Sequence, residues 1–256
     1  MQKNKAPHTL LKIEQKVKKA IYEYGLIEDG DKILIGLSGG KDSLALTEML
    51  AHQRNITVPK FSIVAAHIEL ENVPYKSDIE YLSDFCHKND VEFHHISTKF
   101  APANDKKKDE KTPCFFCSWS RRKALFDTAK QLGCNKIALG HHQDDIVETM
   151  LLNLIFQSSI STMPPKLKMS KFDMTIIRPL CLISEQELIT MQTICNYPKQ
   201  IKTCPFEKNS KRNDIKELLK QMGTLNPNVR QSVWGAMQKI QNEYLPQKVN
   251  RPHQFD

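Results

Sequence analysis

The sequence contains no apolar stretch long enough to cross a membrane. Its longest uncharged run, residues 149–165, is interrupted by polar side chains and ends in two prolines, whereas a membrane-spanning helix needs about 20 mostly apolar residues. The first twenty residues hold six lysines and no apolar core, which excludes a secretory signal. No internal repeat is present. These absences predict a protein that does not enter the membrane and stays in the cytoplasm.

Two common nucleotide-binding motifs and a disulfide framework are also missing. Neither GxxxxGK[ST] nor GxGxxG occurs, so the kinase-type phosphate loop and the dinucleotide-binding fingerprint are excluded. The seven cysteines are an odd number, and a cytosolic chain uses cysteine for metal binding or thiol chemistry more often than for disulfides. Cys86, Cys134, Cys181 and Cys195 lie in apolar contexts and are predicted to belong to the core.

Positive charge is in excess. The chain has 37 Lys and Arg residues against 29 Asp and Glu residues, a formal net charge of +8. The excess is concentrated in residues 1–20 and 199–220, both outside the predicted core. This placement favours a polyanionic partner such as nucleic acid, and the alternative is an ordinary basic surface.

Short apolar runs alternate with segments of helical periodicity. Strands are expected at residues 32–37, 61–69, 91–97, 136–140 and 174–178, and helices between them at 42–53, 77–89, 118–132 and 144–156. This alternation predicts an α/β fold with a doubly wound parallel sheet that binds its ligands at the carboxyl ends of the strands.

Helices are expected to flank the sheet at both ends of the chain. The segment from Leu10 to Tyr24 is amphipathic, and residues 184–196, 212–222 and 228–243 follow the last strand as helices. Three parts are therefore predicted: a basic N-terminal helix (1–28), a central α/β domain (29–205) and a C-terminal helical extension (206–256).

The first chemical motif is SGGKDS at residues 38–43, between a strand and a helix. Gly39 and Gly40 let backbone N–H groups approach an anion, the helix N-terminus adds its positive dipole end, and Lys41 adds a cation. Asp42 and Ser43 can cap the helix or meet a metal ion. The motif predicts a phosphate-binding loop, and the alternative is a tight turn with an ordinary cap.

The second motif is GHHQDD at residues 140–145, again between a strand and a helix. Two carboxylates at the carboxyl end of a strand suit Mg²⁺ and phosphate binding. A structural role is compatible with this for one of them, with Asp144 as the N-cap and Asp145 stabilised by the helix dipole.

The third motif is a CxxC pair, Cys114 and Cys117, together with the distant Cys204. Thiolates at this spacing can bind one ion or cluster, and a redox dithiol, half of a zinc site or chance remain open. His141, His142 or another cysteine could complete a zinc site. Arg121 and Arg122, one turn further on, can contact phosphate or face solvent.

Together these residues resemble one known family. SGGKDS resembles the pyrophosphate loop of the N-type ATP pyrophosphatases, the PP-loop superfamily with an adenine nucleotide alpha hydrolase-like fold. Residues 10 to 205 are similar to the tRNA 2-thiocytidine synthetases. Besides SGGKDS, the shared motifs are PCxxC followed by Ser and a paired Arg, then GHHxDD, and then MPPKL leading to Arg178-Pro179-Leu180. MPPKL discriminates best, because other pyrophosphatases of this type share the first loop.

The resemblance implies an ATP-dependent tRNA-cytidine 2-sulfurtransferase that adenylates the C2 oxygen of a cytidine, at tRNA position 32, and replaces it with sulfur delivered through a [4Fe-4S] cluster. Its partners would be tRNA and a sulfur donor such as a cysteine desulfurase, with a homodimer as one option. The cluster ligands would be Cys114, Cys117 and Cys204. Lys41 and Arg121 would stabilise charge on phosphorus, and Asp42 and Asp145 would hold Mg²⁺. ATP would be bound by Ser38, Gly39, Gly40, Lys41, Asp42, Ser43, Ala66, His67, Gly140 and His141.

The sequence departs from the family around Cys204, where TCPFE replaces a second cysteine pair, and in the C-terminal region. Three alternatives stay open. The protein could thiolate another nucleoside through a persulfide on Cys114 or Cys204 without iron. It could be a PP-loop ligase with a structural zinc, or a nucleotide-binding module without activity. The lack of CxxC pairs at either terminus argues against the zinc-ribbon relatives that make 2-thiouridine.

Overall fold

The computed structural model describes residues 5–55, 58–71, 77–99, 113–170, 172–199 and 211–246, and their side chains except those of residues 5–7 and 113–115. Within these ranges, six strands form one sheet in the order β3-β2-β1-β4-β6-β5. The strands are β1 (Lys32–Gly36), β2 (Ser62–Leu70), β3 (Glu92–Thr98), β4 (Lys136–Ala138), β5 (Lys166–Lys168) and β6 (Thr175–Ile177).

The predicted α/β fold is confirmed, with one addition. Every predicted strand is present, and β3, β2, β1, β4 and β6 pair in parallel. The sequence analysis missed β5, which pairs antiparallel with β6 at the sheet edge and makes the sheet mixed. Only three residues long, β5 lies within the MPPKL segment and the residue after it.

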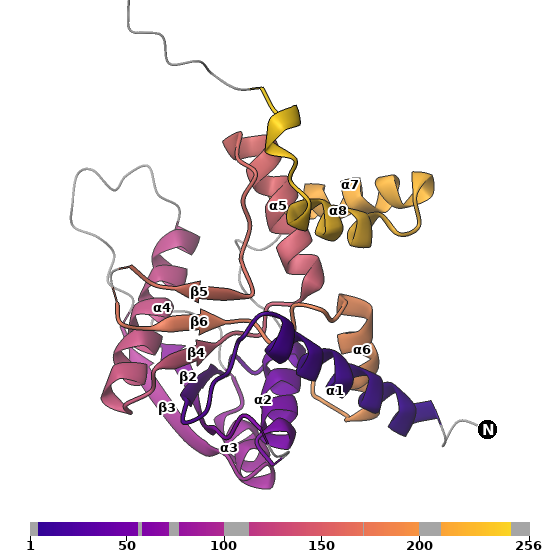
Figure 1. Ribbon diagram of the computed structural model, residues 1–256. Helices are drawn as coiled ribbons and strands as arrows, with labels where there is room; N and C mark the ends of the chain where they lie inside the picture. Colours follow the sequence, from indigo (N-terminus) through magenta and orange to yellow (C-terminus); the bar gives the residue numbers. More distant parts are fainter. Residues whose placement is uncertain are drawn as a thin grey trace, which may run out of the picture.

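Helices cover both faces of the sheet (Figure 1). On one face the core joins strand residues such as Ile33 and Ile35 to α1 (Lys5–Glu23), α2 (Lys41–Gln53), α3 (Ile79–Lys88) and α6 (Glu185–Ile194). On the other face Leu34 and its neighbours pack against α4 (Pro113–Gln131). Because side chains alternate along a strand, the continuous apolar strands supply both cores.

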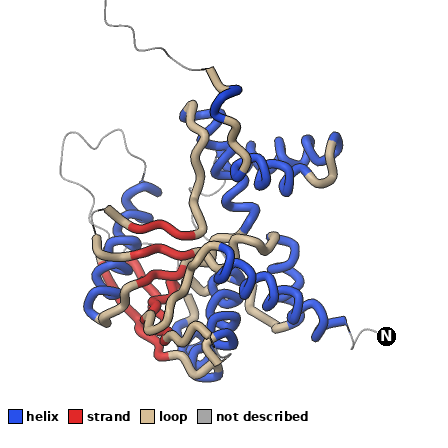
Figure 2. Tube along the Cα trace, in the orientation of Figure 1, coloured by secondary structure: helices blue, strands red, loops and turns tan. Residues whose placement is uncertain are grey.

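A third apolar cluster lies where the remaining helices meet. Helix α5 (Gln143–Gln157) contributes Val147 and Leu151, and α7 (Lys211–Leu225) and α8 (Val229–Gln238) pack on them. Figures 1 and 2 show α7 and α8 against α5, beyond the edge of the sheet. The helix predicted over residues 228–243 is broken: α8 ends at Gln238, and a short 3-10 turn follows at Asn242–Tyr244.

The predicted core cysteines are confirmed at three of four positions. Cys86, Cys134 and Cys181 are buried, whereas Cys195 is only half-buried at the end of α6, 3.9 Å from a carboxylate oxygen of Glu48. The apolar context predicted the helix correctly but not the polar neighbour that α2 brings. Among the described helices, none combines the length and apolarity that crossing a bilayer requires.

The sheet order places two of the three motifs side by side. β1 pairs with β2 on one side and with β4 on the other, so the chain order reverses between β1 and β4. SGGKDS follows β1 and GHHQDD follows β4. Ligands of such sheets bind at this reversal point, outside the carboxyl ends of the strands.

Candidate nucleotide-binding and active site

The SGGKDS loop is closed by hydrogen bonds around Ser43. The Ser43 hydroxyl donates to the carbonyl of Gly40 (2.9 Å) and accepts from the N–H of Ser38 (3.1 Å). Gly39 has a φ of 85°, the left-handed region that favours glycine, and Gly40 is the N-cap of α2. The predicted phosphate loop is therefore already formed, with the start of a helix behind it.

The GHHQDD loop packs directly on the first turn of α2. A Cβ atom on Gly140 would lie 3.0 Å from the carbonyl carbon of Asp42 and 3.1 Å from the backbone nitrogen of Ser43. Any other residue would force the loops apart by a few tenths of an ångström, because the atoms that its Cβ would meet belong to backbone. The two motifs thus form one continuous surface.

Asp145 takes part in the cap of α5. His142 is the N-cap residue, and its backbone N–H donates to Oδ2 of Asp145 over 3.1 Å. The expectation that Asp144 is the N-cap is therefore wrong, because the N-cap lies two residues earlier, at His142, and α5 begins at Gln143.

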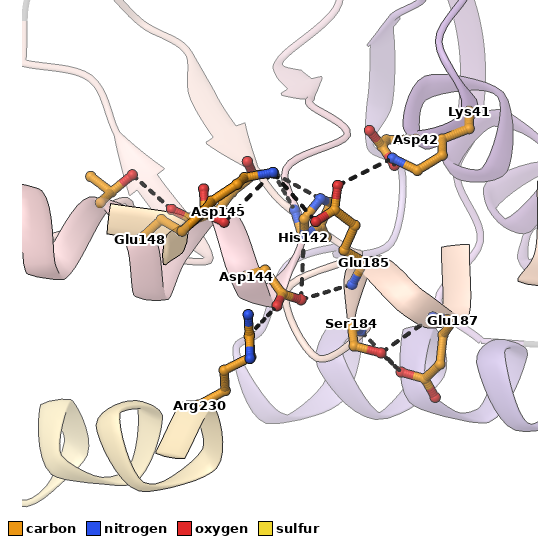
Figure 3. Close-up of polar contacts among 12 residues, drawn as sticks. Lys41, Asp42, His142, Asp144, Asp145, Glu148, Ser184, Glu185, Glu187 and Arg230 are labelled. Atoms are coloured by element: carbon orange, nitrogen blue, oxygen red, sulfur yellow. Dashed lines mark hydrogen bonds and ion pairs between the residues drawn. The ribbon is translucent and has the colours of Figure 1, made fainter. Parts of the chain in front are cut away.

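Asp144 is instead a buried link between three helices (Figure 3). Its Oδ1 lies 2.6 Å from Nε of Arg230 in α8, and its Oδ2 accepts the backbone N–H of Glu185 over 2.7 Å. Asp144 is almost completely buried among these protein groups, which gives it a structural role, whereas the side chain of Asp145 keeps 17% of its surface exposed and is the better placed of the two for a ligand.

The C-terminal helices reach this site, which the sequence analysis missed. Arg212 and Lys216 of α7 pair with Asp145, Glu148 and Glu185. Segment 199–220 was expected to contact phosphate, yet these two cations face carboxylates of the protein. No periodicity or motif signals an ion pair between residues so far apart in the chain. The only hint was the excess of positive charge.

Glu148 is almost completely buried in α5, one turn after Asp145. Burial raises the pKa of Glu148 to about 7, although the nearby cations Lys216 and Arg212 lower it in part. A buried carboxylate disfavours its charged form unless it is well paired. Glu148 therefore changes its charge near neutral pH, beside the basic residues of α7.

Replacing Glu148 with glutamine should make stability less sensitive to pH. The pKa of Glu148 is raised in the folded protein, so its contribution to stability is complete below pH 4.5 and is lost as pH rises to about 7. We expect the melting temperature of Glu148→Gln, relative to wild type, to rise between pH 4.5 and 7 and then level off. The exposed Glu217 of α7 provides the control, Glu217→Gln. If the difference in melting temperature between Glu148→Gln and wild type does not change with pH, the raised pKa of Glu148 is wrong.

Two histidines at this edge of the sheet are uncharged at neutral pH. Burial and the neighbouring Arg178 lower the pKa of His141 to about 4. Burial also lowers the pKa of His67, and the nearby charges of His95 and Arg121 add to the effect. Nδ1 of His67 lies 2.7 Å from the carbonyl of Leu37, immediately before the phosphate loop, which assigns the ring proton to Nδ1.

The other residue predicted for the adenosine, Ala66, precedes His67 on β2. Its side chain is buried in the core on the α4 side, and its carbonyl accepts the N–H of Leu37. Ala66 therefore supports the loop after β1 through its backbone, while its methyl group packs inside the protein.

Helix α4 brings Arg121 and Cys117 toward the same edge of the sheet. Leu125 lies over Gly36, the last residue of β1, with a side-chain carbon 3.2 Å from where a Cβ of Gly36 would be. Arg121 and Cys117 share the face of Leu125, since they precede it by four and eight residues. Because α4 leads back to the start of β4, they lie roughly 6 and 12 Å further toward the carboxyl edge.

The candidate metal ligands are described only in part. Cys117 is half-buried, whereas the side chain of Cys114 and all of Cys204 lie outside the described residues. Within the described part of the chain, no three His, Cys, Asp or Glu side chains form a group that could hold a metal ion. Oδ1 of Asp42 is buried and accepts no hydrogen bond from described residues, with the ammonium of Lys41 3.0 Å away. A buried carboxylate oxygen beside a phosphate loop fits a divalent cation.

The fold and the paired loops define a nucleotide-binding protein of the PP-loop class. Residues 9–221 match the family model described as a PP-loop domain. The tRNA-cytidine(32) 2-sulfurtransferase of Geotalea daltonii is 35% identical over 240 residues, covering 93% of this chain and 94% of the relative. The protein of the same name from Geobacter sulfurreducens is 34% identical and covers 91% of both chains. The chain belongs to the tRNA-cytidine(32) 2-sulfurtransferase family, which confirms the resemblance seen in its motifs.

Solved structures share the fold. The U34-tRNA thiolase NcsA from Methanococcus maripaludis, determined with its [4Fe-4S] cluster, aligns with a TM-score of 0.76 at 22% identity, over 96% of this chain and 82% of that one. The NMN synthetase from Francisella tularensis aligns with a TM-score of 0.52 at 14% identity, over 96% and 99%. At these identities the likeness concerns the fold alone.

Proposed function

We propose that the protein uses ATP to replace the C2 oxygen of a tRNA cytidine, at position 32, with sulfur. The observation that carries the proposal is the backbone contact between Gly140 and the first turn of α2. It joins the phosphate loop to the loop that carries Asp145, in a chain whose relatives are named tRNA-cytidine(32) 2-sulfurtransferases.

In this proposal the loop of residues 38–43 binds the β- and γ-phosphates of ATP. The support is its closed geometry and its position at the start of α2, where N–H groups and the helix dipole attract anions. Asp42 and Asp145 hold Mg²⁺. His67, Gly140 and His141 contact the adenosine of ATP. The imidazole rings of His67 and His141 are uncharged, so they can contact the adenosine without attracting an anion to that part of the site.

The reaction begins with attack of the cytidine C2 oxygen on the α-phosphorus. A bond forms between that oxygen and phosphorus, and the bond from phosphorus to the bridging oxygen breaks, so that pyrophosphate leaves. Lys41 and Arg121 stabilise the negative charge that develops on the phosphoryl oxygens. Sulfur at the oxidation level of hydrosulfide then attacks C2, the C2–O bond breaks and AMP leaves with the bonding electron pair, while the proton of the hydrosulfide passes to solvent.

Cys114, Cys117 and Cys204 are proposed to hold a [4Fe-4S] cluster, which would present sulfur to the base when bound. Three thiolate ligands would leave one coordination position for that sulfur. The support is the CxxC spacing and the position of Cys117 on the sheet-facing side of α4, two turns from Leu125 toward the carboxyl edge. A cysteine desulfurase or another sulfur donor supplies this site.

The remaining parts of the chain are proposed to serve RNA binding. Helix α1, within the predicted basic segment 1–28, presents Lys12, Lys18 and Lys19 as exposed cations, although Lys19 also lies 3.5 Å from Glu23. Lys16 is engaged by Glu187 of α6 at 2.6 Å and is less free to contact phosphate. We propose residues 29–205 as the catalytic domain and residues 206–256 as a C-terminal extension, of which the structure describes residues 211–246.

The proposed function is tested with purified protein, ATP, Mg²⁺ and a sulfur source under anaerobic conditions. Transfer RNA with cytidine at position 32 should gain 2-thiocytidine, with AMP and pyrophosphate formed in equal amounts. A transcript with uridine at that position is the matched control. Thiolation of the uridine transcript alone would contradict the choice of nucleoside. Thiolation by protein without iron would favour a persulfide.

Replacing a cluster ligand should separate sulfur transfer from nucleotide binding. We expect Cys117→Ala and Cys204→Ala to lose iron, sulfide and thiolation but to keep ATP binding, because the phosphate loop does not contain these residues. Cys195→Ala is the control, since Cys195 lies beside Glu48 in the space between α2 and α6 and should keep all four properties. Loss of the cluster in Cys195→Ala with a full cluster in Cys204→Ala would contradict the ligand set.

A further inference from the structure

The guanidinium group of Arg212 contacts one face of α5 with three of its nitrogens. Its Nη1 lies 3.5 Å from Oδ1 of Asp145, its Nε lies 3.6 Å from Oε2 of Glu148, and its Nη2 donates to the hydroxyl of Thr149 over 3.4 Å. Residues three and four positions apart lie on one face of a helix. One side chain of α7 therefore spans the first turns of α5.

This contact completes the restraint on the carboxylate of Asp145. Oδ2 is fixed by the backbone N–H of His142 at the helix N-cap, and Oδ1 faces Arg212. A carboxylate restrained at both oxygens cannot rotate freely about its last bond. Figure 3 shows the side chain of Asp145 between those of His142 and Glu148.

The neighbouring cations of the C-terminal helices make different contacts. Lys216, one turn later in α7, pairs with Glu148 and Glu185, and Arg230 pairs with Asp144. Among the lysine and arginine side chains that the structure describes in this cluster, Arg212 is the one that contacts Asp145, on the oxygen opposite the one that lies 3.4 Å from the ring of His142. The planar fork of an arginine suits this double contact, whereas a lysine presents a single charged point.

We propose that Arg212 is a positioning residue that holds Asp145 in the orientation needed to bind the cation of Mg²⁺-ATP. Helix α7 of the C-terminal extension is then part of the nucleotide site. Glu148 anchors the other end of the guanidinium, which accounts for a carboxylate buried at this point of α5. The inference rests on one part of the proposed function, the use of Mg²⁺-ATP, and not on the nucleoside or the sulfur source.

The test compares ATP affinity with Mg²⁺ and with EDTA, by calorimetry on the full-length protein. The readout is the ratio of the two dissociation constants, which reports the cation contribution without any turnover. Arg212→Gln should reduce this ratio about tenfold or more, because residues that orient a metal ligand contribute 10- to 100-fold to metal affinity. Arg212→Lys keeps the charge without the fork and should recover only part of the loss.

Lys216→Gln is the matched control. This variant removes a cation of α7 that, like Arg212, pairs with Glu148. Lys216 pairs with Glu148 and Glu185 and not with Asp145. Both variants should lower the melting temperature by similar amounts, while only Arg212→Gln changes the ratio. If Arg212→Gln does not fold, Arg212→Lys against Lys216→Gln gives the same comparison.

Three results would overturn the inference: an equal loss in Lys216→Gln, an unchanged ratio in Arg212→Gln, or a raised ratio. The last would mean that Arg212 competes with the cation for Asp145. Wild-type protein that binds ATP without any Mg²⁺ dependence would contradict the nucleotide part of the proposed function itself. Normal Mg²⁺-ATP binding without 2-thiocytidine formation would contradict the proposed function and leave the role of Arg212 intact.

Discussion

Replacing Lys41 with alanine should slow pyrophosphate release by roughly 100- to 1,000-fold, the loss typical of one removed charge-stabilising group. Lys41 is the first residue of α2, directly after the two loop glycines. Its ammonium lies 3.0 Å from Asp42 and 3.9 Å from Glu185, so its charge is held at the phosphate loop. The measurement is pyrophosphate formed per enzyme in the presence of ATP, Mg²⁺ and tRNA.

The fold should tolerate this change, because the lysine does not belong to an apolar core. Lys123→Ala is the control, since Lys123 also loses an aspartate partner at 3.0 Å, the exposed Asp127 one turn further in α4. Lys123→Ala should change the free energy of unfolding by no more than about 1 kcal/mol, as the loss of an exposed ion pair does. Lys41 is half-buried beside Asp42, so Lys41→Ala should cost more than this control while the protein stays folded at the assay temperature. Full turnover by Lys41→Ala would contradict the phosphate assignment.

The position of the two nucleotide-binding motifs could be predicted because it follows from topology. SGGKDS and GHHQDD each stand between an apolar strand and a helix, and parallel strands end at one edge of a sheet. The strand order then makes β1 and β4 neighbours. What the sequence did not reveal was how tightly the loops pack, which depends on the missing side chain of Gly140.

The contribution of the C-terminal helices could not be predicted, for a physical reason. Periodicity shows that α7 and α8 are amphipathic but not which surface they cover. Arg212 and Arg230 meet Asp145 and Asp144 across more than sixty residues of chain, and ion pairs at such separations have no local pattern. Charge alone suggested an external phosphate partner, whereas these carboxylates lie within the protein.

The short strand β5 was missed for a different reason. Lys166, Leu167 and Lys168 alternate as a strand does, but three residues do not establish a period. The strand forms because its backbone pairs with β6 in the sheet, a contact that local propensity does not encode.

Replacing Gly140 with alanine should damage both stability and nucleotide chemistry. The added Cβ would stand 3.0 to 3.1 Å from backbone atoms of Asp42 and Ser43, so the two loops must move apart. Overpacking of this kind typically costs about 1–3 kcal/mol of unfolding free energy. The displaced groups carry the phosphate site, and their shift by a few tenths of an ångström should slow pyrophosphate release by less than the roughly 100-fold loss that a misplacement of 1 Å can cause. Denaturant unfolding and pyrophosphate release measure the two effects.

Gly235→Ala is the control for the loss of a glycine. Gly235 lies inside α8, where a Cβ would meet nothing within 4 Å. Alanine is the better helix former by about 1 kcal/mol, so this variant should be as stable as wild type or more stable, with unchanged pyrophosphate release. Gly140→Ala should instead lose activity even at temperatures where it is fully folded, because the displaced loop persists in the native state. Normal activity in folded Gly140→Ala would show that the close contact between the two loops is not needed for catalysis.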